Sequence, residues 1–213
     1  KLQIYSTNRS LKRFGNDSDG GYVAPVEIIK NLDYLISIGV EDNMSFESDL
    51  MRENINLETI LVDGTIENLS TPDRVRFINK NLGSINDQNH ITLEELLKNI
   101  ESENIALQID IEYDEWEVFE SIPKEILKKF KLIIVELHIV FIDEEMILKS
   151  QKLSPYFTKF YKNTYKKINK VILEKYNNVL NKILTNFSVI HLHANNSLKL
   201  QKHNGVSFPP LLE

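Results

Sequence analysis

The stretch Leu107-Gln-Ile-Asp-Ile-Glu-Tyr-Asp-Glu-Trp116 decides the fold, because an apolar run passes directly into a group of carboxylates. Side chains two residues apart in a strand point to the same side, so Asp110 and Glu112 face one side where this strand ends. In an open α/β sheet, that edge is where ligands bind. The stretch therefore predicts a sheet that carries its chemistry at the carboxyl ends of its strands.

Short apolar runs alternate with longer amphipathic segments along the chain, which is the pattern of an α/β fold. The runs at 106–111 and 132–135 are almost continuously apolar, as expected for parallel strands covered on both faces. We predict one domain, residues 1–213, with a mostly parallel central sheet and helices on both faces. The predicted strands are 34–38, 59–63, 105–111, 132–139 and 187–192. The predicted helices are 45–53, 72–80, 92–101, 116–122, 124–129, 144–149 and a long one near 155–185.

The segment 155–185 combines lysines with apolar residues at roughly helical spacing. The simplest interpretation is an amphipathic helix with a solvated lysine face. The alternative is a basic lid that faces an anionic substrate. The lysines are Lys159, Lys162, Lys166, Lys167, Lys170, Lys175 and Lys182.

Composition argues against several classes of protein. A hydrophobic content of 42% suits one globular core, and a net charge of -6 argues against a nucleic-acid-binding surface. The chain has no cysteine, which excludes disulfides and thiolate sites and favours a reducing, cytoplasmic location. No signal peptide is visible, and no apolar run approaches the roughly 20 residues that span a bilayer. The chain begins at Lys1 without Met, which fits a domain excised from a longer protein.

Two further strand ends carry residues that suit a nucleotide. The strand 34–38 runs into Gly39, where a glycine lets the backbone approach a ligand closely. The next strand ends at Asp63, and an acid about 20 residues beyond such a glycine holds ribose hydroxyls in nucleotide-binding folds. The alternatives are a plain strand-to-helix turn at Gly39 and a turn aspartate before Gly64.

Polar side chains also follow the two remaining strands at alternate positions. They are Glu136 with His138, and His191 with His193, the latter followed by Asn195 and Asn196. Carboxylates and imidazoles form a ligand set for ions such as Fe, Mn or Zn, and equally a general acid/base set. A single histidine of this kind is about as often a hydrogen-bonded core residue as it is a functional one. The indication of a site comes from three such pairs at three strand ends.

In this order, these pieces resemble the FkbM-type branch of S-adenosylmethionine-dependent methyltransferases and the relatives grouped with methyltransferase-like protein 24. The resemblance extends from about Arg13 to Glu213, and it departs from the family pattern at three places. Glu-Asp-Asn occupies 41–43 where a second glycine is frequent, Tyr113 replaces a glycine, and Gly64 replaces a proline. The matching blocks are Arg13, Gly15 and 19–23; Ser37, Gly39 and 45–47; Asp63; Thr92 and Leu93; 109–112 and 115–117; Glu136 and His138; His193, Asn195 and Asn196; and Gly205, Pro209, Pro210 and 212–213.

The resemblance implies a Rossmann-like class I methyltransferase that binds S-adenosylmethionine. The cofactor would lie over Gly39, with Asp63 on the ribose and Asp87 on the adenine side. The turn 19–22 would cover the methionine end, as part of an N-terminal cap at 1–30. The implied cofactor-binding residues are Asp19, Gly20, Gly21, Tyr22, Gly39, Ser45, Asp63, Asp87 and Asp110.

Methyl transfer to a hydroxyl needs alignment of the two reactants and removal of the hydroxyl proton. In one version, the catalytic residues Asp110, Glu136 and His193 supply the base directly. In the other, a divalent metal (Fe, Mn or Mg) lowers the pKa of the hydroxyl. The metal ligands would come from Asp110, Glu112, Glu136, His138 and His193. Substrate contacts would come from Glu112, His138, Asn195 and Asn196.

The expected function is therefore O-methylation of a small polar acceptor, such as a sugar or nucleotide-linked sugar in capsule or glycan biosynthesis. No nucleic-acid partner and no membrane span are expected, and a homo-oligomer is left open. Two other functions stay open at this point. One is a degenerate methyltransferase fold that only binds a partner, and the other is a metal-dependent hydrolase that uses the same acids and histidines.

Overall fold

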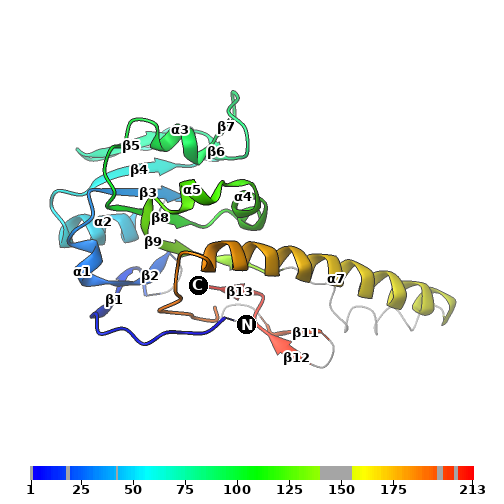
Figure 1. Cartoon of the computed structure of the whole chain (residues 1–213). Coiled ribbons are helices and arrows are strands. Elements are labelled where there is room, and N and C mark those ends of the chain that lie inside the picture. The colour runs from blue at the N-terminus through cyan, green and yellow to red at the C-terminus, as the bar shows by residue number, and fades with distance from the viewer. Residues whose placement is uncertain (1, 18–19, 42, 140–154, 196–198, 204–205) are drawn as a thin grey trace.

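The centre of the protein is a five-stranded, entirely parallel sheet in the order β5-β4-β3-β8-β9 (Figure 1). The computed structural model describes residues 2–17, 20–41, 43–139, 155–195, 199–203 and 206–213; for 155–166 and 203 it describes the backbone alone. The strands are β3 (Tyr34–Ile38), β4 (Glu58–Val62), β5 (Val75–Ile78), β8 (Ile105–Ile109) and β9 (Phe130–Val135). The chain starts in the middle at β3, moves outward through β4 and β5, and returns to the other side through β8 and β9. The direction of winding thus reverses between β3 and β8.

One face of the sheet is covered by the N-terminal part of the chain. The hairpin of β1 (Leu11–Gly15) and β2 (Gly21–Pro25) leads into α1 (Val26–Ile29), and α2 (Ser45–Glu53) follows β3. Phe46 and Leu50 of α2 pack with Leu35 of β3 and Ala106 of β8. Burying a side chain such as Phe46 or Leu50 stabilises the fold by about 1.5–3 kcal/mol, which fixes α2 beside the end of β3.

The other face is covered by α3 (Leu93–Leu97), α4 (Glu115–Ser121), α5 (Lys124–Leu127) and part of α7 (Pro155–Leu184). Trp116 of α4 and Tyr176 of α7 stack with ring centroids 3.8 Å apart. The Trp116 indole also donates a hydrogen bond of 2.6 Å to the carbonyl of His138. The carboxyl-terminal part of α7 lies against the domain, and its amino-terminal part extends away from it (Figure 1). The prediction of an α/β fold with helices on both faces is confirmed.

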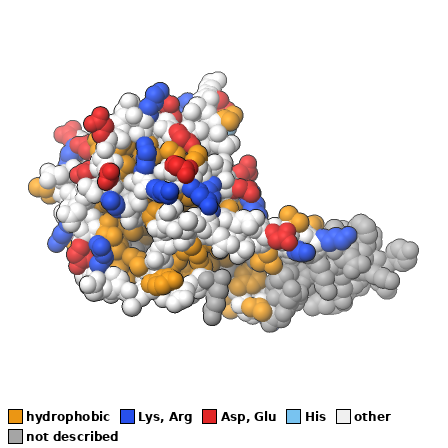
Figure 2. All heavy atoms as spheres, viewed as in Figure 1, with side chains coloured by type: hydrophobic (Ala, Val, Ile, Leu, Met, Phe, Trp, Pro, Cys, Tyr) orange, Lys and Arg blue, Asp and Glu red, His pale blue; other side chains and the backbone are white. Residues whose placement is uncertain are grey.

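Four short pairings complete the described part of the chain, besides the central sheet. The hairpin β1-β2 is the first, and β6 (Asn81–Leu82) pairs with β7 (His90–Ile91). β10 (Leu137–His138) pairs antiparallel with β13 (Leu211–Leu212), and β11 (Gln201–His203) with β12 (Val206–Phe208). On the face shown in Figure 2, charged side chains of both signs are interspersed in the upper part, while hydrophobic ones gather below. Among the described residues, no helix has the length and apolar character that crossing a membrane requires.

The structure corrects several predicted elements. The helix predicted at 72–80 is wrong, because this segment contains β5. Val75 is buried and Arg76 is exposed, a two-residue alternation, and Arg74 has a φ of 69° that interrupts any helix. The strand predicted at 187–192 forms only a single bridge, between Val189 and Ile4. The strand predicted at 132–139 divides into β9 and β10, because the chain leaves β8 after Val135 and turns to β13. The helix predicted at 144–149 lies outside the described residues.

Candidate functional site

A cavity of about 700 Å³ opens at the carboxyl ends of β3 and β8, where the winding of the sheet reverses. Loops after β3, β8 and β9 form its walls, together with β2 and the segment around His193. Ligands of open α/β sheets bind at such a reversal point. The predicted residues that line it are Gly20, Tyr22, Gly39, Asp110, Glu112, Glu136, His138, His193 and Asn195.

Four predicted residues do not line this cavity, and two others, Asp19 and Asn196, lie outside the described residues. Gly21 pairs with Gly15 in the β1-β2 hairpin, and Ser45 begins α2. The Asp63 carboxylate is buried and accepts hydrogen bonds from the amides of Glu41 and Thr65 and from the Thr65 hydroxyl. Asp87 closes the exposed turn before β7, where it accepts from the amides of Asn89 and His90.

Gly39 is required by the contact between β3 and β8. Its φ is +78°, which favours glycine, and a Cβ there would lie 1.5 Å from the carbonyl oxygen of Asp110. From the sequence, we interpreted Gly39 as a position where the backbone approaches a ligand. In the structure, the backbone of Gly39 instead approaches the backbone of Asp110, which brings the Gly39 loop and Asp110 together at one edge of the cavity.

Asp110, which is half-buried, and Glu136, which is buried, form a pair of acids on the ends of neighbouring strands, joined by a hydrogen bond. Burial raises the pKa of Asp110 to about 6, against the opposing effects of the Tyr22 hydrogen bond and of His138. Burial and the charge of Asp110 raise the pKa of Glu136 to about 8. The two carboxyls can therefore hold one proton between them near neutral pH, with Asp110 as the member that ionises first.

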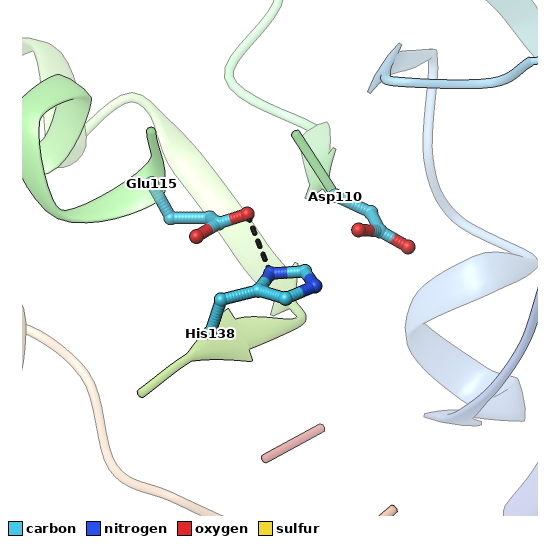
Figure 3. Close-up of side chains that lie close together, drawn as sticks. All are labelled: Asp110, Glu115 and His138. Atoms are coloured by element: carbon cyan, nitrogen blue, oxygen red, sulfur yellow. Dashed lines mark hydrogen bonds and ion pairs between the residues drawn. The ribbon is translucent and has the colours of Figure 1, made fainter. Parts of the chain in front are cut away.

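His138 follows β9 and presents its two ring nitrogens to different carboxylates. Nδ1 lies 2.9 Å from Oε1 of Glu115, and Nε2 lies 3.4 Å from Oε2 of Glu112. Burial lowers the pKa of His138, but the hydrogen bond to Glu115 and the charges of Glu115, Glu112 and Asp110 outweigh it, so this pKa is raised overall. Figure 3 shows Nδ1 of His138 turned to Glu115 and the other ring nitrogen turned toward the side of Asp110.

The loop that carries Glu112 is held in an unusual backbone conformation. Glu112 and Tyr113 have φ values of 52° and 85°, a region that L side chains rarely adopt. The Tyr113 ring lies over His138, with centroids 4.8 Å apart. The left-handed conformation of Tyr113 costs about 1–2 kcal/mol relative to a glycine at this position.

Asp110, Glu115 and His138 offer ligand atoms that all lie within 4.8 Å of one another. Glu115 is fully buried, and its Oε2 has no partner among the described residues. Carboxylate and imidazole donors are those that Fe, Mn and Zn accept. These three side chains are therefore the candidates for holding such an ion, and the hydrogen bond from His138 to Glu115 orients the imidazole.

His193 and Asn195 enter the site from the last part of the chain. The backbone of His193 exchanges two hydrogen bonds with Glu213, of 2.8 and 2.9 Å, and the Asn195 amide donates to the Glu213 carboxylate at 3.3 Å. The charge of Glu213 contributes to the raised pKa of Glu136. His193, Asn195, Leu211 and Glu213 thus form part of the lining of the cavity.

Sequence reasoning missed three buried polar residues: Glu47, Gln108 and Glu115. Glu115 stands inside the decisive stretch, three residues after Glu112, but it entered only as part of the resemblance and had no assigned role. Gln108 could have been found from the sequence, since it is the one polar residue within the apolar strand 105–109 and a buried polar side chain needs a partner. Glu47 was part of the resemblance alone and had no assigned role.

A second cavity, of about 490 Å³, lies between β9, the end of α7 and residues 187–192. Its walls are mainly aliphatic and aromatic, and it carries none of the paired acids of the first. No described residue of α7 lines the first cavity, so a lid formed by the lysine-rich helix stays a prediction.

The chain has no match among protein-family models, curated proteins or solved structures.

Proposed function

We propose that this protein is an S-adenosylmethionine-dependent O-methyltransferase with a Rossmann-like class I fold, acting on a hydroxyl of a small polar acceptor. One observation carries the proposal. The cavity at the reversal point of the parallel sheet is lined both by the Gly39 loop and by a group of proton-accepting side chains, Asp110, Glu136 and His138. This supports a site in which a nucleotide-like cofactor and groups that can accept a proton lie close together.

The residues around Gly39 fit such a cofactor. A volume of about 700 Å³ lies within the roughly 300–1,000 Å³ range of cofactor and ligand sites. Gly20, Tyr22 and Gly39 would hold S-adenosylmethionine, which supplies a methyl group activated by its sulfonium. The Asp63 carboxylate already accepts hydrogen bonds from the amides of Glu41 and Thr65. Asp63 would therefore contribute to ribose binding indirectly, by holding the loop after β3 in place.

The chain's own residues would deal with the acceptor proton. During transfer, the acceptor oxygen forms a bond to the methyl carbon while the carbon–sulfur bond breaks, and the hydroxyl proton must pass to a base. Asp110 suits this task, because its pKa of about 6 leaves it ionised at neutral pH yet basic enough to accept a proton. His193 and Asn195, which also line the cavity, would position the acceptor.

A divalent metal would supply a second way to acidify the hydroxyl. Asp110, Glu115 and His138 are the residues that fit it, and Glu112 lies beside Nε2 of His138. Carboxylates and an imidazole that surround the acceptor also suit hydrogen bonding to the several hydroxyls of a sugar. A sugar or nucleotide-linked sugar of capsule or glycan biosynthesis therefore stays the proposed acceptor class.

The test is calorimetric titration of the protein with S-adenosylhomocysteine, with and without Mn²⁺ or Fe²⁺. Micromolar binding is expected, and Gly39→Val, which fills the contact beneath the proposed cofactor, should abolish it. Asp87→Asn, which changes an exposed turn away from the cavity, serves as the matched control and should bind normally. Absence of binding under every metal condition would overturn the proposal.

The Asp110, Glu115 and His138 group also supports a second function, metal-dependent hydrolysis. Binding of Mn²⁺ or Fe²⁺ without any affinity for S-adenosylhomocysteine would favour it. The same calorimetric experiment separates the two functions, because only the methyltransferase predicts heat on addition of S-adenosylhomocysteine.

A further inference from the structure

A continuous line of buried polar side chains connects α2 to the acid pair of the cavity. The Ser37 hydroxyl lies 2.5 Å from Oε1 of Glu47 and 2.7 Å from Oε1 of Gln108. Nε2 of Gln108 lies 3.5 Å from the Tyr22 hydroxyl, which in turn lies 3.0 Å from Oδ2 of Asp110. Glu47, Ser37, Gln108 and Tyr22 are each at most 5% exposed, so these contacts are made in the protein interior.

Counting hydrogens fixes the protonation of this line. Ser37 makes two short contacts to oxygen atoms, and each needs a hydrogen between the two oxygens. A serine hydroxyl supplies one hydrogen and the Gln108 carbonyl supplies none. The second hydrogen must therefore come from the carboxyl group of Glu47.

The backbone fixes which way the Gln108 amide points. The amide of Ile38 donates to Oε1 of Gln108 at 3.2 Å. Rotating the side-chain amide by half a turn would set an NH₂ group against this N–H, so two donors would face each other. With Oε1 turned to Ile38 and Ser37, Nε2 is turned to Tyr22 and can only donate.

We propose that Glu47 is a neutral carboxylic acid at neutral pH and begins a one-way chain of hydrogen bonds that ends with Tyr22 donating to Asp110. Glu47 donates to Ser37, Ser37 donates to Gln108, Gln108 donates to Tyr22, and Tyr22 donates to Asp110. Glu47 and Ser37 are thus positioning residues. Among the described residues, the hydroxyl hydrogen of Tyr22 is then directed to a carboxylate of the acid pair.

Two observations support a neutral Glu47. Its other oxygen, Oε2, is buried and has no partner among the described residues, which an ionised carboxylate tolerates poorly. Burial also raises the pKa of Glu47 above its ordinary value, although the Ser37 hydrogen bond opposes this. Glu47 also lines the cavity, and the other charged or titratable groups that line it are Arg13, Asp17, Glu41, Asp110, Glu112, Glu136, His138, His193 and Glu213.

Infrared spectroscopy tests the protonation directly and does not depend on any enzymatic activity. In the variant Glu47→Gln, the amide donates to Ser37 as the neutral acid does, so the fold should persist. The difference spectrum between wild type and Glu47→Gln at pH 7 should show loss of a protonated carboxyl band. Loss of carboxylate bands instead would overturn the proposal. The exposed Glu94→Gln is the matched control and should remove carboxylate bands only.

The hydrogen bond between Glu47 and Ser37 can be tested by the frequency of the infrared carboxyl band. In Ser37→Ala, the Glu47 acid loses its acceptor, so its carboxyl band should persist but shift in frequency. A band that keeps its wild-type frequency would overturn the chain of hydrogen bonds.

The pH dependence of the unfolding free energy gives a second, independent test of the protonation of Glu47. A carboxyl with a raised folded pKa keeps its proton when the unfolded chain has lost it, so the wild type loses stability as pH rises through that window. Relative to Glu47→Gln, the wild-type unfolding constant should rise by about tenfold per pH unit above the ordinary glutamate pKa, until Glu47 ionises. A wild type that gains stability over Glu47→Gln as pH rises would overturn the proposal.

Discussion

Nδ1 of His138 lies 2.9 Å from Oε1 of Glu115, and both side chains are buried. The same oxygen of Glu115 accepts from the amide of Ile111 at 3.0 Å. One carboxylate oxygen thus fixes both the imidazole that ends β10 and the loop that carries Glu112. Because Nδ1 is engaged there, Nε2 is the nitrogen left to act in the cavity.

Removing this carboxylate should destabilise the protein strongly. In Glu115→Ala, Nδ1 of His138 and the amide of Ile111 lose their acceptor in the interior. We expect the free energy of unfolding to fall by about 3–5 kcal/mol, and by less in Glu115→Gln, which keeps an acceptor oxygen. Urea denaturation measures both. Glu117→Ala, an exposed position on the same helix, should change stability by no more than about 0.5 kcal/mol, and an equal loss in both alanine variants would contradict the prediction.

The acid pair predicts the pH dependence of the proposed methyl transfer. The pKa of Asp110 is about 6, so the base is protonated below that pH and the rate should rise as pH increases through about 6. A second change in the rate of methyl transfer should appear near pH 8, where Glu136 loses its proton.

Asp110→Asn should lower kcat by about 10²–10⁴-fold and remove the rise near pH 6. Steady-state rates from pH 5 to 9 measure this, with Asp87→Asn as the control for loss of an aspartate outside the cavity. If Asp110→Asn retains the same rising limb, then another group is the base.

Local patterns predicted the elements around the site well. The strand at Tyr34–Ile38 and the helix at Ser45–Glu53 have the predicted bounds, because an apolar run and a helical period each occur there without interruption. Glu136 and His138, two residues apart, both reach the cavity, as alternation in an extended chain predicts. The position of Asp110 followed from the same reasoning.

Residues whose role depends on distant partners could not be predicted. Glu115 acts on His138, 23 residues away in sequence, and Glu47 meets Ser37 only because α2 packs back on β3. β5 was mistaken for a helix because its alternation covers only four residues between Pro72 and Lys80, too few to outweigh a helix-like spacing of apolar residues. Asp63 illustrates the converse: the sequence places it at a strand end, but hydrogen bonds to Glu41 and Thr65 engage its carboxylate.

A side chain at Gly39 should disrupt the edge of the sheet that holds the site. Alanine at a φ of +78° costs about 1–2 kcal/mol, and its Cβ would also meet the Asp110 carbonyl at 1.5 Å. We therefore expect Gly39→Ala to lose more than this amount, with a lower Tm in thermal unfolding. Gly83→Ala is the comparison, because its Cβ would meet only the side chain of His90, at 3.1 Å. Equal effects of the two substitutions would show that the contact with Asp110 is not what requires a glycine.

Lys182 should anchor α7 to the domain rather than act as part of a lid. Its ammonium donates to the carbonyls of Phe119 and Glu120, both at 2.9 Å, and so satisfies acceptors at the end of α4. Lys182→Met keeps the apolar stem and removes both hydrogen bonds, which should lower the free energy of unfolding by about 1–3 kcal/mol. Lys170→Met removes only an exposed pair with Glu174 at 3.8 Å and should cost at most about 0.5 kcal/mol. Hydrogen exchange should show faster opening of the 167–184 part of α7 in Lys182→Met alone, and the same protection in both variants would mean that the Trp116 and Tyr176 stack holds the helix by itself.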